Sequence, residues 1–170
     1  MATIATDVTI RPATLDDLPR MMAIYNHYVI NTPTTFDMEP KDLADRSEWF
    51  SHYAETGRHR LLVAVRDGAV AGYTSSSRFH PRAAYDTTVE TTILCAPEHV
   101  GYGIGQQLYE ALFAAIAAED IHSAVALITL PNRGSTELHE RMGYRRVGVI
   151  EEAGRKFGQY WDVVWYQKKL

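Results

Sequence analysis

Three glycines alternate directly in front of a segment with a helical apolar pattern, at Gly101, Gly103 and Gly105. Glycine has no Cβ, so the backbone can follow tight turns that a side chain would obstruct. Free N–H groups at the start of a helix attract anions, and the helix dipole adds to this attraction. Apolar side chains then recur every four positions, at Leu108, Leu112 and Ile116. This order is typical of a loop that binds a phosphate at a helix N-terminus.

The motif excludes some phosphate ligands and leaves a purely structural turn open. No Gly-Lys-Ser/Thr follows the glycines, which excludes a nucleotide-binding P-loop. The dinucleotide fingerprint fits poorly, because Leu108 stands where its third glycine would be and four predicted strands precede the loop. Glycine-rich turns also precede many helices for structural reasons alone, so the loop needs support from the rest of the chain.

The elements that must position this loop follow from changes in the apolar period along the chain. They alternate as β-α-α-β-β-β-α-β-α-β-β, which predicts a mixed sheet flanked by helices, an α/β (α+β) fold, in a single domain spanning residues 1–170. We expect strands at 8–13, 60–65, 69–79, 87–96, 123–130, 145–154 and 160–170. We expect helices at 14–31, 42–56, from 105 to about 119, and at 132–143.

Composition narrows the class of protein. The chain has 170 residues, 46% of them hydrophobic and 22% charged, with a net charge of −4 that argues against a nucleic-acid partner. Cys95 is the only cysteine, so an intrachain disulfide is excluded, and the histidines show no metal-ligand spacing. We expect no signal peptide and no membrane span, because no apolar run approaches about 20 residues. A cytoplasmic protein without a metal fits these features.

Several segments resemble a known family. The run Val100-Gly101-Tyr102-Gly103-Ile104-Gly105 resembles the pyrophosphate loop of the GNAT N-acetyltransferases, Gln/Arg-x-x-Gly-x-Gly/Ala, and departs from it at Val100. His99 could compensate for the missing polar side chain. More specific likenesses point to the phosphinothricin acetyltransferase branch, which includes enzymes for methionine sulfoximine and methionine sulfone. They lie in "TTFDMEP", "AYDTTVETTILC", "LPNRGSTELHERMGY" and "GRKFGQYWDVVWYQ".

The resemblance implies an acetyl-CoA cosubstrate, direct acetyl transfer to the α-amine of a small amino-acid acceptor, and a homodimer. Such a transfer needs a base to take a proton from the amine and a donor to stabilise the oxyanion. Glu90 stands where the family places its base, although a carboxylate in mid-strand could also simply face solvent. His139 stands where an acid could protonate the departing thiolate, with a structural histidine as the alternative. A nucleophilic Cys95 is disfavoured, because a lone cysteine ending an apolar strand is usually a core residue.

Cosubstrate contacts follow from the same resemblance. Glu90 precedes the glycines by about a dozen positions, and an extended chain of that length would span on the order of 30 Å. The strand between would pair its backbone with the pantetheine amides and supply an oxyanion donor. Asn132 and Ser135 would contact the coenzyme as well as cap the last helix. The expected acetyl-CoA contacts are Ile93, Leu94, Cys95, Gly101, Tyr102, Gly103, Ile104, Gly105, Gln106, Asn132 and Ser135.

The acceptor is expected at the loop "HPRAAYD", residues 80–86. Arg82 offers a planar fork for a carboxylate or phosphinate, although an ordinary surface arginine is the alternative. The full set of expected acceptor contacts is Phe36, His80, Pro81, Arg82, Tyr85, Thr91 and Thr92. Two other functions remain open: a GNAT enzyme that acts on a peptide or protein N-terminus, and a non-catalytic acetyl-CoA sensor. A closed pocket would disfavour the first, and intact Glu90 and His139 disfavour the second.

Overall fold

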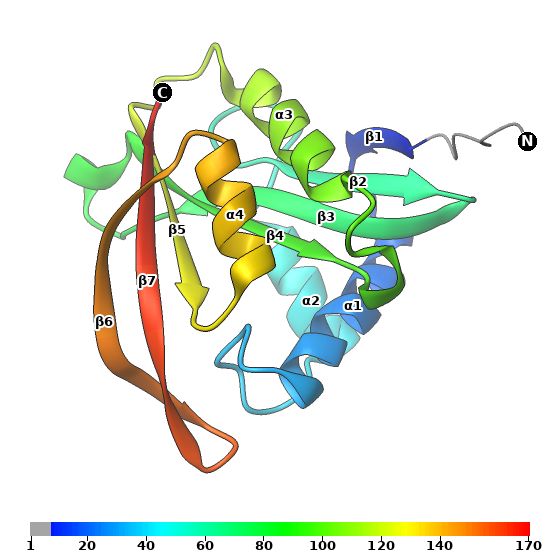
Figure 1. Cartoon of the computed structure of the whole chain (residues 1–170). Coiled ribbons are helices and arrows are strands. Elements are labelled where there is room, and N and C mark those ends of the chain that lie inside the picture. The colour runs from blue at the N-terminus through cyan, green and yellow to red at the C-terminus, as the bar shows by residue number, and fades with distance from the viewer. Residues whose placement is uncertain (1–7) are drawn as a thin grey trace, which may run out of the picture.

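Seven strands form one mixed sheet in the computed structural model, which describes residues 8–170 (Figure 1). The spatial order is β1-β2-β3-β4-β5-β7-β6. All neighbouring strands are antiparallel except β4 and β5. The strands are β1 (Val8–Pro12), β2 (Leu61–Arg66), β3 (Ala69–Arg78), β4 (Thr88–Cys95), β5 (Ser123–Thr129), β6 (Arg145–Lys156) and β7 (Gln159–Lys169).

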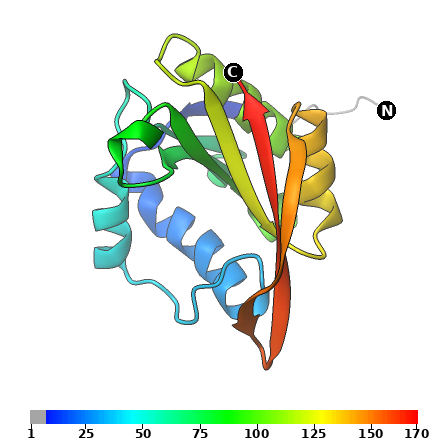
Figure 2. The same ribbon diagram turned by 90° about the vertical axis from the view of Figure 1, so that its left-hand side faces the viewer.

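Two pairs of helices cover the two faces of the sheet (Figure 2). On one face α1 (Leu18–Asn31) and α2 (Leu43–Phe50) pack on Tyr73 and Leu94. On the other face α3 (Ile104–Ile116) and α4 (Arg133–Arg141) pack on Leu62 and Ile93. The molecule therefore has two separately covered sides, and the sheet lies between them.

The predicted order of elements and the fold class are confirmed, with differences at two helices. The second helix ends at Phe50 rather than at residue 56, because the amides of His52 and Tyr53 bond to carbonyls three positions back. Thr14 caps a short 3-10 helix, Leu15–Asp17, and α1 begins after it with Pro19 in its first turn. The prediction about a signal peptide concerns the N-terminus, residues 1–7 of which lie outside those described.

The parallel pair β4–β5 is short. Backbone pairing joins only Thr88, Val89 and Glu90 of β4 to Ser123, Ala124 and Val125 of β5. Beyond these three pairs the strands separate, although β4 stays paired with β3 and β5 stays paired with β7. Beyond Glu90 the edges of β4 and β5 therefore face each other without backbone hydrogen bonds, and a cleft begins at this residue.

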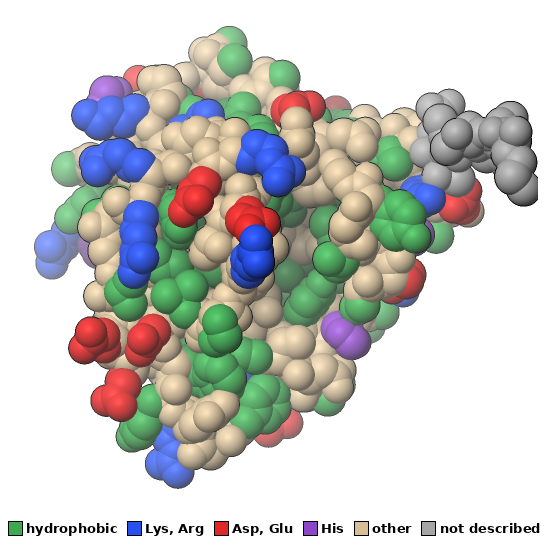
Figure 3. Space-filling view, viewed as in Figure 1, with side chains coloured by type: hydrophobic (Ala, Val, Ile, Leu, Met, Phe, Trp, Pro, Cys, Tyr) green, Lys and Arg blue, Asp and Glu red, His purple; other side chains and the backbone are tan. Residues whose placement is uncertain are grey.

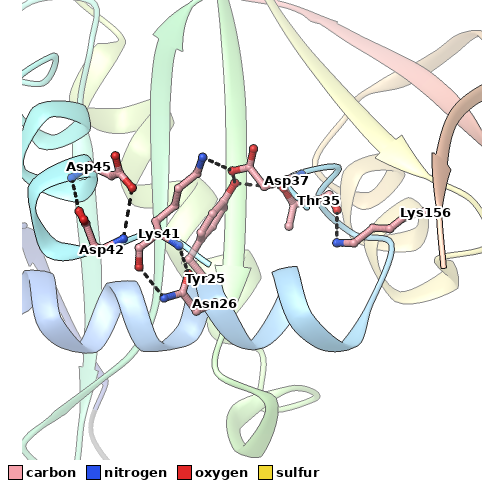
Figure 4. Close-up of polar contacts among 8 residues, drawn as sticks. All are labelled: Tyr25, Asn26, Thr35, Asp37, Lys41, Asp42, Asp45 and Lys156. Carbon is pink, nitrogen blue, oxygen red and sulfur yellow. Dashed lines mark hydrogen bonds and ion pairs between the residues drawn. The ribbon is translucent and has the colours of Figure 1, made fainter. Parts of the chain in front are cut away.

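The long β6–β7 hairpin, at the lower end of the molecule in Figure 1, contacts the segment between α1 and α2. Lys156 donates a hydrogen bond to the carbonyl oxygen of Thr35 at 2.7 Å, as Figure 4 shows. A Cβ at Gly154 would lie 2.3 Å from the ring of Phe36, so this ring lies directly on the hairpin backbone. Among the described residues no helix is long and apolar enough to cross a bilayer.

Candidate active site

A cavity of about 610 Å³ occupies the cleft between β4 and β5, and the surface is hollowed beside α4 (Figure 3). Its walls come from α1, α2, β3, β4, β5, α3 and α4. Of the predicted site residues it brings together Glu90, Thr91, Thr92, Ile93, Leu94, Asn132, Ser135 and His139. A substantial cleft therefore lies where the sheet opens.

Alternation along β4 divides this cavity into two sides. Glu90, Thr92 and Leu94 pair across from Ser77, Ser75 and Tyr73 of β3. Leu94 and Tyr73 pack with α1, so this set faces the α1–α2 side. Ile93 packs with α3 instead, so Thr91 and Ile93 face the α3–α4 side. A ligand on each side would meet the other at the β4–β5 opening.

Glu90 lies at the vertex of the cleft on the α1–α2 side. The side chain is half-buried and has no hydrogen-bond or ion-pair partner among the described residues. Burial raises the pKa of its carboxyl group. A carboxylate with a raised pKa, next to a cavity and without a protein donor, has the properties of a general base for an amine.

Thr91 fixes the opening of the sheet from the opposite side. Its hydroxyl is buried, lies 2.5 Å from the hydroxyl of Tyr144, and donates to the carbonyl oxygen of Val125 at 3.3 Å. This bond follows the last backbone pair of the two strands and anchors the vertex. The predicted bond from Thr91 to the acceptor would have to compete with these contacts, whereas Thr92 is exposed at the cavity wall.

His139 on α4 is held by hydrogen bonds at both ring nitrogens. Nδ1 donates to the carbonyl oxygen of Ser135 at 2.7 Å, so Nε2 accepts from the hydroxyl of Tyr109 at 2.8 Å. The side chain is 3% exposed, and burial lowers the pKa of the imidazole. His139 is therefore a neutral ring at neutral pH. Its predicted acid role would require a proton on Nε2, where Tyr109 now donates.

The glycine loop has the geometry of an anion site, although its three glycines have different functions. Gly101 and Gly103 have φ values of 88° and 75°, and no atom lies within 4 Å of a Cβ built on either. None of the N–H groups from residue 101 to 106 donates to another described residue. At Gly105, by contrast, a Cβ would lie 2.9 Å from Leu138 Cδ2. Gly103 thus shapes the loop, and Gly105 lets α3 approach α4.

Acetyl-CoA fits these features. The free amides at the start of α3 can hold its phosphates, and the unpaired edge of β4 can bond its pantetheine amides. The extended backbone ends at Cys95, however, and the 3-10 turn Pro97–His99 follows. The sequence suggested an extended chain from Glu90 to the glycines, whereas the structure is extended only as far as Cys95.

Two further features of this side concern charge and capping. The Asn132 side chain accepts from the Ser135 amide at 3.2 Å, which confirms the cap on α4. Val100 is 60% exposed and offers no polar group to the loop. The guanidinium of Arg66, a residue not selected from the sequence, lies 4.3 Å from the ring centre of Tyr102. Arg66 thereby brings to the loop a positive charge that the Val100 side chain cannot supply.

Cys95 lies at the end of β4. Burial raises the pKa of its thiol to about 11, so the thiolate needed for nucleophilic attack is scarce at neutral pH. Its carbonyl oxygen already accepts a hydrogen bond from Tyr28 at 2.6 Å. These observations agree with a core residue that contributes backbone to the cleft. Within residues 8–170 no group of three or more His, Cys, Asp and Glu side chains has a metal-binding arrangement.

The loop predicted to bind the acceptor lies elsewhere on the molecule. His80, Pro81, Arg82 and Tyr85 surround a short 3-10 helix before β4, at the closed end of the β4–β5 pair, and do not line the cavity. Arg82 and Tyr85 are exposed. Phe36 does not line the cavity either, because its ring packs on Gly154. The roles predicted for these five residues remain predictions.

The α1–α2 side is lined instead by residues that sequence reasoning did not select. Tyr25, Arg46, Trp49, Tyr53, Tyr73, Ser75 and Ser77 form this wall. The segment between α1 and α2, which borders this wall, is held to α1 by two hydrogen bonds (Figure 4). The Asn26 side chain donates to the Lys41 carbonyl oxygen at 2.8 Å, and its oxygen accepts from the Lys41 amide. The wall is therefore a fixed part of the fold. The available sequence signal was the spacing of Arg46 to Trp49 and Phe50, which puts the three on one face of α2.

Comparison with known proteins gives one consistent result. Residues 21–144 match the sequence model of the Acetyltransferase (GNAT) family. A phosphinothricin N-acetyltransferase of Streptomyces coelicolor is 47% identical over 166 residues, covering 96% of this chain and 97% of that protein. An L-methionine sulfoximine/L-methionine sulfone acetyltransferase of Pseudomonas aeruginosa is 36% identical over 162 residues, covering 95% and 94%.

Structural similarity extends over the same range. The crystal structure of a GNAT superfamily phosphinothricin acetyltransferase from Sinorhizobium meliloti, in complex with AcCoA, superposes with a TM-score of 0.90. The two chains are 32% identical, and the match covers 96% of this chain and 88% of that one. Three findings point to the same family. They are the sheet that opens after three parallel pairs, the glycine loop, and the family match over residues 21–144. The chain therefore belongs to the GNAT family and is an acetyl-CoA-dependent N-acetyltransferase.

Proposed function

We propose that this enzyme transfers the acetyl group of acetyl-CoA directly to the α-amine of a small amino acid of the phosphinothricin, methionine sulfoximine or methionine sulfone type. The observation that carries the proposal is Glu90, an unpartnered carboxylate at the point where the two sides of the cavity meet. The relatives named for these three acceptors support the substrate class.

Each side of the cavity has its own part in the reaction. Acetyl-CoA binds on the α3–α4 side, with its phosphates on the amides of residues 101–106 and its pantetheine arm along the edge of β4. The acceptor binds on the α1–α2 side, where Glu90 takes a proton from the ammonium directly or through a water. An amide of β4 near Ile93 stabilises the oxyanion. His139 remains the predicted proton source for the thiolate; in that role it would first have to take up a proton on Nε2, which now accepts from Tyr109.

A small acceptor agrees better with this cavity than a protein N-terminus does. The segment between α1 and α2 and the β6–β7 hairpin close the acceptor side, with Phe36 on Gly154 and Lys156 on Thr35. We infer further that the enzyme works in the cytoplasm, as a homodimer, and that acetylation inactivates a toxic amino acid.

A substrate panel with purified enzyme tests the proposal. Free thiol release from acetyl-CoA is measured with phosphinothricin, methionine sulfoximine, methionine sulfone, ordinary amino acids and a short peptide. We expect turnover of at least one of the three analogues, and Glu90→Gln should lower kcat by about 10²- to 10⁴-fold. The loss should shrink as pH rises, because more amine is then already neutral. Turnover of the peptide alone would exclude the proposal.

A further inference from the structure

Arg46 is the one buried residue of α2, and residues 8–170 offer it no ion-pair partner. The neighbouring positions of this eight-residue helix are exposed, whereas the Arg46 side chain is 5% exposed and lines the cavity. Its Nε and Nη2 atoms are buried without a hydrogen-bond partner among the described residues. A buried charge without a partner is unfavourable, since the solvation it loses is not replaced.

Two aromatic rings hold the guanidinium by its flat faces. Its carbon atom lies 3.7 Å from the centre of the Trp49 ring and 4.6 Å from that of Tyr25. Such cation–π contacts fix the plane of the guanidinium and leave its N–H edge available. The positive charge is also felt by the phenol of Tyr73, where it opposes the rise in pKa caused by burial.

Three nearby carboxylates could neutralise Arg46, but none forms an ion pair with it, and two of them have other partners. Asp37 accepts from the hydroxyl of Tyr25 at 2.5 Å and pairs with Lys41 at 3.4 Å (Figure 4). Asp45 takes part in the capping box of α2 with Asp42. Glu48 is exposed and forms no ion pair with Arg46. The site is therefore built with a planar donor and without an internal acceptor for it.

Arg46 and Glu90 share the same side of the same cavity. Glu90 pairs with Ser77 of β3, and Tyr73, next to Arg46, lies four positions along the same face of that strand. The α-carboxylate of an amino acid is attached to the carbon that carries the amine, so an acceptor with its amine near Glu90, directly or through a water, presents its carboxylate to this same wall, which the long Arg46 side chain also lines. The three proposed acceptors share one anionic group, the α-carboxylate, which matches a guanidinium edge with two parallel hydrogen bonds.

We propose that Arg46 binds the α-carboxylate of the acceptor and thereby makes the enzyme specific for free amino acids. This inference rests on the proposed function and adds the residue that recognises the substrate class. It predicts that amines without a neighbouring carboxylate, among them amino-acid amides and peptides of which only the N-terminus enters, are poor acceptors.

The experiment compares two changes, one in the enzyme and one in the substrate. Methionine sulfone and its carboxamide are assayed with wild type, Arg46→Met and Arg46→Lys, the last of which keeps the charge without the fork. Replacement of the carboxylate should raise the acceptor KM of wild type by about ten- to a hundredfold. Arg46→Met should raise the KM for the acid to a similar level and leave that for the carboxamide unchanged. Arg46→Lys should lie between, and the KM for acetyl-CoA should stay constant.

A purely structural Arg46 would give a different pattern. The variant would then affect acid and carboxamide equally, and the preference for the acid would survive, which would overturn the inference. Arg141→Met, an exposed arginine on α4, is the matched control and should behave as wild type. If Arg46→Met does not fold, the same comparison with Arg46→Lys decides. A wild-type enzyme that is inactive on every amino acid tested would instead refute the proposed function.

Discussion

Gly103→Val tests the anion-binding loop directly. Gly103 is the residue before α3, and its φ of 75° is a conformation that is strongly unfavourable for a β-branched residue. Since no atom lies within 4 Å of the added Cβ, the free-energy cost is that of the backbone strain alone, about 1–2 kcal/mol. For a protein of this size that lowers Tm by about 2–8 °C. The variant should therefore fold.

The functional effect should be larger than the effect on stability. Valine either crowds the phosphates or turns amides of the loop away from them, so at least one charge-assisted hydrogen bond is lost, about 1.5–3 kcal/mol. The KM for acetyl-CoA should rise by about ten- to a hundredfold, and the acceptor KM should change little. Thiol release at varied acetyl-CoA, together with thermal melting, measures both effects.

Gly105→Ala is the matched control. Its Cβ meets the flexible Leu138 side chain at 2.9 Å, and alanine gains about 1 kcal/mol of helix propensity in compensation. Its KM for acetyl-CoA should stay within about threefold of wild type. An unchanged KM in Gly103→Val, or equal increases in both variants, would refute an anion site at this loop.

Three other outcomes are expected. Burial raises the folded-state pKa of Glu90, so the protonated carboxyl contributes stability at low pH, and this contribution is lost as pH rises through that pKa. Glu90→Gln should therefore melt at a higher temperature than wild type at about pH 8. In a series of melting curves the difference should vanish toward about pH 4. Arg66→Ala should raise the KM for acetyl-CoA and weaken its salt dependence, and an unchanged KM at low salt would argue against a charge role for Arg66. Light scattering at micromolar concentration should give twice the chain mass of 19.2 kDa, since the edge strand β6 exposes Val147 and Ile150, and a monomer would contradict the dimer.

The sequence predicted the fold, the glycine turn before α3 and the cap of α4, because all three depend on local patterns. Apolar period and turn residues specify each strand, and the glycine loop is a contiguous segment. Asn132 caps α4 as its residue type suggests. The end of α2 was misplaced because helical propensity continues past Phe50 while the fold turns the chain there.

The acceptor side could not be read in the same way, because it is assembled from distant segments. Arg46 stands between acidic and polar neighbours and reads as a surface residue, although its spacing to Trp49 and Phe50 places it on the apolar face of α2. Glu90 and Arg82 are close in sequence, but they lie at opposite ends of the β4–β5 pairing. Arg82 lies before β4 at the closed end, whereas Glu90 is the last paired residue, where the cleft opens. Proximity along the chain therefore did not give proximity in the cavity.

The contact of the β6–β7 hairpin with the α1–α2 segment also determines when the enzyme can become active during synthesis. Lys156 and the Thr35 carbonyl that it holds are 121 positions apart, and Gly154 supports Phe36 over a similar distance. The ribosome makes α1, α2 and Glu90 long before the hairpin, so the acceptor side stays open until β6 and β7 have been made and have folded onto it. A chain that lacks the hairpin therefore has no closed pocket for an amino acid.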